Sequence, residues 1–145
     1  MPHDPTRPDT AHRKLRAVAR GLAATGLAVD AYLHAHLAER YDAVSATISQ
    51  GTLFRIEAAI AALAALLVLV WRHALADVFA WTVAAGGLAA LLLYRYVDVG
   101  ELGPLPNMYE PAWFTDKNIV VIAQVVALIA TSVLLLTRRR RRHLA

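Results

Sequence analysis

The chain has 145 residues and a formal net charge of +4, and 58% of its residues are hydrophobic, whereas a soluble domain is usually about 45–50% apolar. The apolar residues gather in long runs, which is typical of a membrane protein and argues against a large soluble core. The absence of cysteine excludes disulfide bonds, thiolate metal ligands and thiol redox chemistry in this chain. Basic clusters occur near both ends without any motif that reads bases, so we expect no nucleic-acid binding.

Four apolar segments are each long enough to cross a bilayer core, which takes about 20 helical residues. In chain order they lie at about residues 17–37, 53–71, 78–94 and 119–136. The short first and middle connections predict an up-down-up-down bundle. The expected fold class is therefore all-α, a polytopic membrane protein with one four-helix domain over residues 13–137. Residues 1–12 are expected to form a disordered cytoplasmic tail, and residues 138–145 a basic cytoplasmic tail.

Basic residues are distributed unevenly between the two sides of this predicted bundle. Ten flank the membrane at the termini, and only four lie on the opposite side, namely Arg40, Arg55, Arg95 and Lys117. Because basic segments stay in the cytoplasm, both termini are predicted to be cytoplasmic in a bacterial cytoplasmic membrane. A C-terminal run would end the last span and contact anionic lipid headgroups; it consists of Arg138, Arg139, Arg140, Arg141 and Arg142.

Polar residues inside the predicted spans concentrate in the half of the bundle away from the termini. Asp30 and His34 are one helical turn apart on one face of the first span, and Glu57 enters the same leaflet from the second. The other candidate ligand-binding residues at this level are Tyr94, Arg95 and Gln124. The half near the termini is expected to be almost purely apolar.

Two interpretations of this polar layer are open, because a carboxylate in lipid must be paired, solvated or protonated. In the first, the two carboxylates pair with basic residues in a network that only fixes helix register. The basic residues available are Arg55, Arg95 and Lys117. In the second, Asp30, His34 and Glu57 form a site for a proton, a polar ligand or a divalent metal ion. No other cofactor is predicted.

The loop over residues 98–116 contains three prolines and several aromatic residues, and a loop of this length is often functional. We expect it to fold over the mouth of the bundle as a lid, through Tyr109, Glu110 and Trp113. The alternative is an interfacial belt that only anchors the loop in the membrane.

Two segments resemble a group of uncharacterised small actinobacterial four-helix integral membrane proteins. They are Gly51–Val70 (GTLFRIEAAIAALAALLVLV) and Leu93–Lys117 (LYRYVDVGELGPLPNMYEPAWFTDK). The resemblance implies source and topology but no activity. The four-helix layout is also similar to that of DoxX-like proteins, as an analogy of architecture only.

The sequence contains no obvious nucleophile–base pair, phosphate loop or cofactor motif, so a non-enzymatic accessory or interaction subunit is the leading interpretation. It would carry a polar pocket under the 98–116 loop and act as a homo-oligomer or beside a membrane partner. The first alternative is binding or transport of an ion, a proton or a small solute through Asp30, His34 and Glu57. The second is a membrane enzyme or redox partner that acts on a lipophilic substrate such as a quinone.

Overall fold

The computed structural model describes the backbone of residues 7–143 and the side chains of residues 10–139. Within these residues the chain forms helices and loops and no strand, which confirms the all-α class. The α-helices are α1 (Arg7–Leu37), α2 (Gln50–Val70), α3 (Ala74–Tyr96) and α4 (Thr115–His143). A short 3-10 helix, η1 (Ala38–Tyr41), continues α1.

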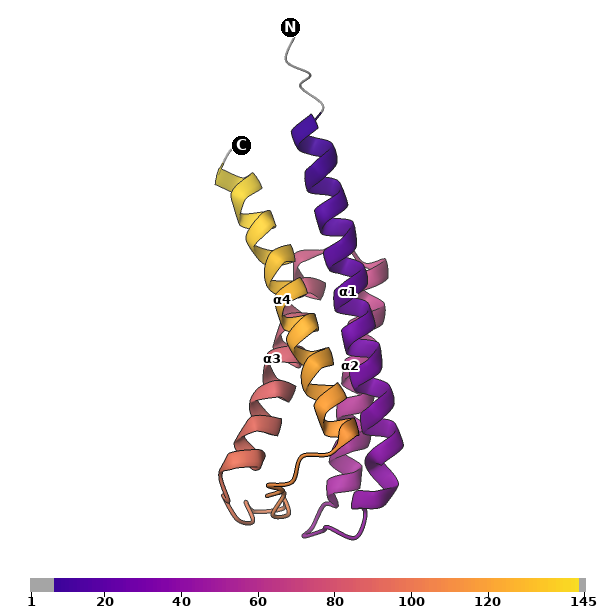
Figure 1. Cartoon of the computed structure of the whole chain (residues 1–145), viewed down its shortest axis with the longest axis vertical. Helices are drawn as coiled ribbons and strands as arrows, with labels where there is room; N and C mark the ends of the chain where they lie inside the picture. The colour runs from indigo at the N-terminus through magenta and orange to yellow at the C-terminus, as the bar shows by residue number, and fades with distance from the viewer. Residues whose placement is uncertain (1–6, 144–145) are drawn as a thin grey trace, which may run out of the picture.

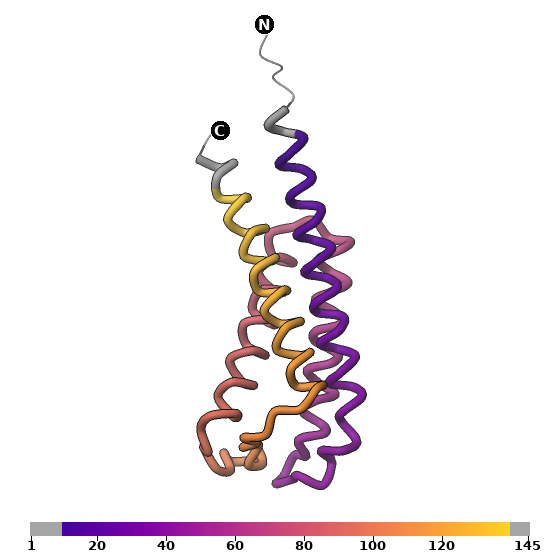
Figure 2. Tube along the Cα trace, viewed as in Figure 1, coloured from indigo at the N-terminus to yellow at the C-terminus, as the bar shows by residue number. Residues whose placement is uncertain are grey.

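Successive helices run in opposite directions, so both termini lie at the same end of the molecule (Figures 1 and 2). We call this the terminus end, and we call the opposite end, with the connections 42–49 and 97–114, the loop end. α1 packs mainly against α2 and α4, and α3 packs against α4 and α2. α1 and α4 extend beyond the turn between α2 and α3 at the terminus end (Figure 1).

Among the described residues, three helices are long and apolar enough to cross a membrane. They are α2 and α3 over their full lengths and α4 over Thr115–Arg139. These helices contain the predicted spans 53–71, 78–94 and 119–136 to within one residue. α1 is not in this class, because Arg20, Asp30 and two histidines lower its hydropathy. The predicted first span, 17–37, therefore stays a prediction.

The two helices at the terminus end are longer than the predicted spans. α1 begins at Arg7, inside the predicted tail 1–12, and Pro8 is tolerated there because an N–H in the first helical turn has no intrahelical partner. α4 continues through the arginine run to His143. Residues 1–6 lie outside the described part of the chain, as do the side chains of Arg140, Arg141 and Arg142. Their predicted disorder and headgroup contacts stay predictions.

Small residues let the helices pack closely. The core is largely alanine, and its fully buried larger members are Leu27, Val68 and Leu134. At the crossing of α1 and α4, a Cβ on Gly26 would lie only 2.6 Å from the Ala123 carbonyl oxygen, so glycine is needed there. Such close backbone approach stabilises helix pairs where lipid supplies no hydrophobic drive between them.

A charged cluster joins α1, α3 and α4 at the terminus end. Asp77 is fully buried, and its carboxylate accepts hydrogen bonds from Arg20 at 3.3 Å and from Arg138 at 2.7 Å. The Arg16 guanidinium lies 4.0 Å from the same carboxylate. We call these four residues the arginine–aspartate cluster. It fixes the relative positions of three helices through one carboxylate.

The same guanidinium groups also satisfy backbone carbonyls where helices end. Arg20 donates to the Val68 carbonyl near the end of α2, and Arg138 donates to the Arg72 carbonyl in the α2–α3 turn. The expectation that this half of the bundle would be almost purely apolar is therefore wrong. The physical reason is that α3 begins three residues before Asp77 and carries its carboxylate into the bundle.

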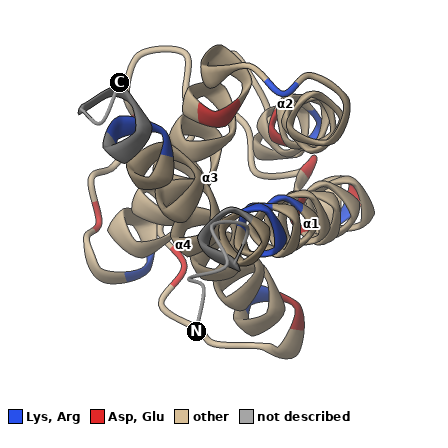
Figure 3. Cartoon of the chain, turned by 90° about the horizontal axis from the view of Figure 1, so that it is seen from above, with Lys and Arg blue, Asp and Glu red and all other residues tan. Residues whose placement is uncertain are grey.

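The arginine run is only partly available to lipid. Arg138 is half-buried in the arginine–aspartate cluster, whereas Arg139 is exposed. Figure 3, seen from the terminus end, shows basic positions along α1 and α4. Of the two described members of the run, Arg139 is therefore the one left for headgroup contact.

Asp77→Asn keeps the size of the side chain but removes the negative charge that Arg20 and Arg138 bind. We expect the variant to lose about 3–5 kcal/mol of unfolding free energy, the usual cost of removing one partner from a buried ion pair. The measurement is thermal unfolding of the detergent-solubilised protein. Asp42→Asn is the control, because Asp42 forms an exposed pair with Arg55, and such pairs contribute little. Equal melting temperatures for the two variants would contradict the role of the cluster.

Candidate functional site

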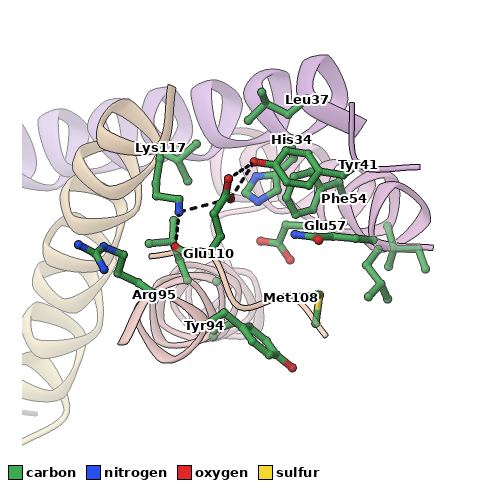
Figure 4. Close-up of a pocket in the computed structure, with 18 of the residues that line it drawn as sticks. His34, Leu37, Tyr41, Phe54, Glu57, Tyr94, Arg95, Met108, Glu110 and Lys117 are labelled. Atoms are coloured by element: carbon green, nitrogen blue, oxygen red, sulfur yellow. Dashed lines mark hydrogen bonds and ion pairs between the residues drawn. The ribbon is translucent and has the colours of Figure 1, made fainter. Parts of the chain in front are cut away.

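A cavity of about 370 Å³ lies at the loop end and is lined by residues of all four helices, of η1 and of the 97–114 loop (Figure 4). Much of its wall is apolar or aromatic; examples are Leu37, Phe54, Leu91, Met108 and Phe114. Charged and polar side chains enter it at a few points. We call it the loop-end cavity.

A hydrogen-bonded group of three side chains lies at the α1–α4 side of this cavity. His34 Nδ1 lies 2.9 Å from Asp30 Oδ1 and 3.0 Å from the Asp30 carbonyl oxygen. Both oxygens are acceptors, so Nδ1 carries a hydrogen. From α4, Gln124 Nε2 donates to the same carboxylate oxygen at 3.1 Å. The structure thus brings together three residues that the sequence places at one level.

Glu57 reaches the cavity from α2, and its carboxylate points into the space between α1 and α3 (Figure 4). A Cβ on Gly87 of α3 would lie 3.0 Å from Glu57 Oε1 and 2.6 Å from Gln124 Nε2. Glycine at this position therefore makes room for both polar side chains.

Three buried oxygen atoms in this region have no hydrogen-bond partner among the described residues. They are Asp30 Oδ2, Glu57 Oε1 and Gln124 Oε1. A buried polar atom without a partner costs about 1–3 kcal/mol, so such atoms are rare and mark strain, an ordered water or a ligand. All three are acceptors, and a buried donor of the same cavity wall, Arg95 Nε, also has no hydrogen-bond partner among the described residues.

The basic side chains at this end are engaged elsewhere. Arg55 pairs at 2.8 Å with Asp42 on the surface, because it lies two residues from the cavity glutamate and on another face of α2. The Arg95 guanidinium lies 5.0 Å from the centre of the Trp113 ring. Lys117 binds the loop. The predicted network in which these three residues neutralise the two buried carboxylates is therefore wrong.

Glu110 fastens the 97–114 loop over the cavity. Its carboxylate accepts a hydrogen bond from the Tyr41 hydroxyl at 2.7 Å and lies 3.4 Å from Lys117 Nζ. Its backbone N–H donates to the Tyr94 carbonyl at the end of α3. Lys117 also donates to two loop carbonyls, those of Glu110 and Ala112. The loop therefore lies where a lid was expected and is attached to η1, α3 and α4.

The remaining candidates lie at the edge of the site. Tyr109 and Trp113 are exposed and do not line the cavity, although Trp113 holds the Arg95 side chain. Tyr94 and Arg95 line it from the end of α3, but the Tyr94 hydroxyl and the Arg95 guanidinium point away from Glu57 (Figure 4). Of the three expected lid residues, only Glu110 contributes to the wall.

Asp30, His34 and Glu57, the residues predicted to hold a metal ion, are not arranged as a set of metal ligands. Among the described residues, no group of three or more His, Asp or Glu side chains is arranged to hold a metal ion. His34 Nδ1 faces the Asp30 carboxylate, so imidazole and carboxylate bind one another instead of a shared ion. The structure therefore gives the divalent-metal interpretation no support.

Two aromatic residues of the site are not among those predicted from the sequence. Phe54 packs edge-on against His34 at 5.1 Å between ring centres and against Tyr41 at 4.9 Å. Phe54 lies three residues before Glu57, so helical spacing places it on the same face of α2. This helical spacing is the signal in the sequence that could have identified Phe54 as a residue of the site. Tyr41 enters through η1, which continues α1 beyond the predicted end of the first span at residue 37.

Comparisons of this chain with protein-family models, with curated proteins and with solved structures find no match. The resemblance to small actinobacterial four-helix membrane proteins therefore stays a prediction. The site has to be interpreted from its own geometry.

Tyr41 is expected to ionise at a higher pH than an ordinary tyrosine. Its burial, followed by its hydrogen bond to Glu110, raises the pKa of the Tyr41 hydroxyl. Because the folded pKa exceeds the unfolded value of ~10, the contact stabilises the closed loop below about pH 10 and is lost as the pH rises through the folded pKa. The measurement is phenolate absorbance against pH for the wild type and for Tyr41→Phe. The difference between the two curves should appear above the usual tyrosine range; a difference centred within that range would contradict the buried contact.

Proposed function

We propose that this chain is a small-molecule-binding membrane protein that takes an amphipathic ligand into the loop-end cavity and performs no chemistry on it. The observation that carries the proposal is an apolar, aromatic-lined cavity whose wall includes a buried, unpaired acceptor, Glu57 Oε1. Ligand pockets in proteins have this composition, with a mainly apolar wall and a few polar groups that orient the ligand. Such a protein suits the role of an accessory subunit that acts beside a membrane partner or as a homo-oligomer.

The proposal includes four membrane spans, with α1 as the first. The 18 residues from Arg20 to Leu37 extend about 27 Å at ~1.5 Å per residue, close to the ~30 Å of a bilayer core. Arg20 contacts the Val68 carbonyl near the end of α2, so this part of α1 lies level with a helix that is apolar enough to cross. Asp30, which lowers the hydropathy of α1, is buried inside the bundle.

The proposed orientation has both termini in the cytoplasm of a bacterium and the loop-end cavity facing the outer leaflet. The described basic residues at the terminus end are Arg13, Lys14, Arg16, Arg20, Arg72, Arg138 and Arg139. Those at the loop end are Arg40, Arg55, Arg95 and Lys117. Because basic segments are retained in the cytoplasm, this imbalance supports the orientation.

Transport of ions or protons is less well supported by the same geometry. Asp30 and Asp77 are the fully buried carboxylates, and the core between them consists of alanine, leucine and valine. The buried Thr131 hydroxyl in that region donates to its own helix backbone. A polar path along one copy of the bundle would have to cross this apolar layer.

An enzyme acting on a lipophilic substrate is also less well supported. The lining residues include no serine, threonine or cysteine that would serve as a nucleophile. The lining lysine, Lys117, is tied to Glu110 and to loop carbonyls. The polar groups left in the cavity are suited to binding.

The orientation can be tested by cysteine labelling, because the chain contains no cysteine of its own. Glu101→Cys in the exposed loop should react with a membrane-impermeant maleimide added to intact cells, and Ala11→Cys should react only after the membrane is opened. Ser45→Cys provides a second position at the loop end. Reaction of Ala11→Cys in intact cells would contradict the proposed orientation. If Ala11→Cys and Glu101→Cys are labelled from opposite sides, the chain crosses the membrane an odd number of times between residues 11 and 101. That result would support a crossing by α1 in addition to those of α2 and α3.

Gly86→Leu should block the cavity without disturbing the fold. Gly86 lines the cavity, and a Cβ there would meet no atom within 4 Å. We expect saturable binding of 4-phenylbutan-1-ol to wild-type protein in nanodiscs, and loss of at least nine tenths of that binding in the variant. Gly21→Leu is the matched control, since Gly21 also has open space around it but lies outside the lining. Equal binding by the two variants would argue against the cavity as the site.

A further inference from the structure

The charges around the loop-end cavity restrict the kind of ligand that it can hold, and this step rests on the proposed binding function. Asp30 is fully buried, and Glu57 lines the cavity; Glu57 Oε1 and the Gln124 amide that binds Asp30 both lie close to Gly87. Two carboxyl groups therefore lie in one low-dielectric site, and each has one oxygen that no donor of the described residues binds.

Within the described part of the chain, His34 is the only ionisable donor bound to this pair. It contacts the inner oxygen of Asp30 and leaves the other oxygen of Asp30 unpaired. Arg55 and Lys117 pair with Asp42 and Glu110. The Arg95 guanidinium lies over the Trp113 ring and points away from Glu57, although its Nε has no hydrogen-bond partner among the described residues (Figure 4). The terminus end is the opposite case, since three guanidinium groups surround the single carboxylate of Asp77.

We infer that the ligand of the loop-end cavity is a small organic cation, an ammonium group carried on an apolar or aromatic body. The ammonium would donate to Glu57 Oε1 and supply the positive charge that the carboxylate pair lacks. Charge-assisted hydrogen bonds of this kind are roughly twice as strong as neutral ones. A neutral hydroxyl would satisfy an acceptor but leave the charge of the pair uncompensated.

The rest of the wall suits the same class of ligand. Phe54 and Tyr94 line the cavity, and aromatic faces attract ammonium groups. The Phe114 ring shows such a contact within the chain, because Lys117 Nζ lies 5.2 Å from its centre. A bare metal ion would need several oxygen ligands around one point, and the described residues do not offer that arrangement. The apolar wall also leaves most of the cavity to a hydrocarbon body.

The experiment compares two probes that differ only in the head group, 4-phenylbutan-1-amine and 4-phenylbutan-1-ol. Binding to the full chain in nanodiscs of uncharged phosphatidylcholine is measured by equilibrium dialysis at neutral pH, with empty nanodiscs subtracted. The variants are Glu57→Gln and Asp30→Asn. Asp42→Asn is the control, because it removes a carboxylate from the same end of the bundle but outside the lining. Far-ultraviolet circular dichroism and elution volume check that each variant folds.

We expect the amine to bind the wild type at least tenfold more tightly than the alcohol. Glu57→Gln should remove this preference by weakening the amine alone, and Asp42→Asn should retain it. If Glu57→Gln does not fold, Asp30→Asn decides the same question. Equal affinity for both probes, or a preference that survives in Glu57→Gln or Asp30→Asn, would overturn the organic-cation inference and leave the binding function standing. If neither probe binds the wild type, or if Gly86→Leu weakens the binding of neither probe, the binding function itself is overturned.

Discussion

A carboxylate inside an apolar bundle needs a partner, and the two ends of this molecule meet that constraint in opposite ways. At the terminus end, Asp77 is surrounded by three guanidinium groups that also bind carbonyls at helix ends. At the loop end, the His34 imidazole binds Asp30, and Asp30 and Glu57 each keep one unpaired oxygen. The first arrangement closes the bundle, because every helix near Asp77 is tied to the same carboxylate or to its arginines. The second leaves a polar site that the chain itself does not complete.

Helix packing follows the same division. Small residues draw α1 against α4 at Gly26, where the backbone of the opposite helix leaves no space for a side chain. α3 makes little contact with α1 and diverges from it towards the loop end (Figure 1). The glycines of α3 then add space instead of contact: Gly86 faces the cavity, and Gly87 accommodates Glu57 and Gln124. The 97–114 loop covers the opening because Glu110 binds η1, α3 and α4 together.

Much of this fold could be predicted from local sequence, and the partners of the charged residues could not. Long apolar runs predict α2, α3 and α4, and i, i+4 spacing predicts that Asp30 and His34 share a face. Which arginine meets which carboxylate depends on helix rotation and on where each helix begins. Asp77 lies just before the predicted span 78–94, yet α3 starts early enough to bury it. Two basic residues could have been expected to pair with Glu57, because Arg55 is close to it in the sequence and Arg95 lies at the same level of the bundle. Arg55 instead lies on another face of α2, and the Arg95 guanidinium lies over the Trp113 ring.

The contrast between the two ends gives a physical reason for a cationic ligand. Buried arginines bring their own hydrogen-bond donors and satisfy Asp77 permanently, at the cost of fixing the helices around it. A site that has to exchange its ligand cannot use a covalently attached cation in this way. Asp30 and Glu57 each keep one oxygen without a donor, and the proposed ammonium group would donate to Glu57. A cation bound beside Glu57 would then do for the loop end what Arg20 and Arg138 do for Asp77, but reversibly.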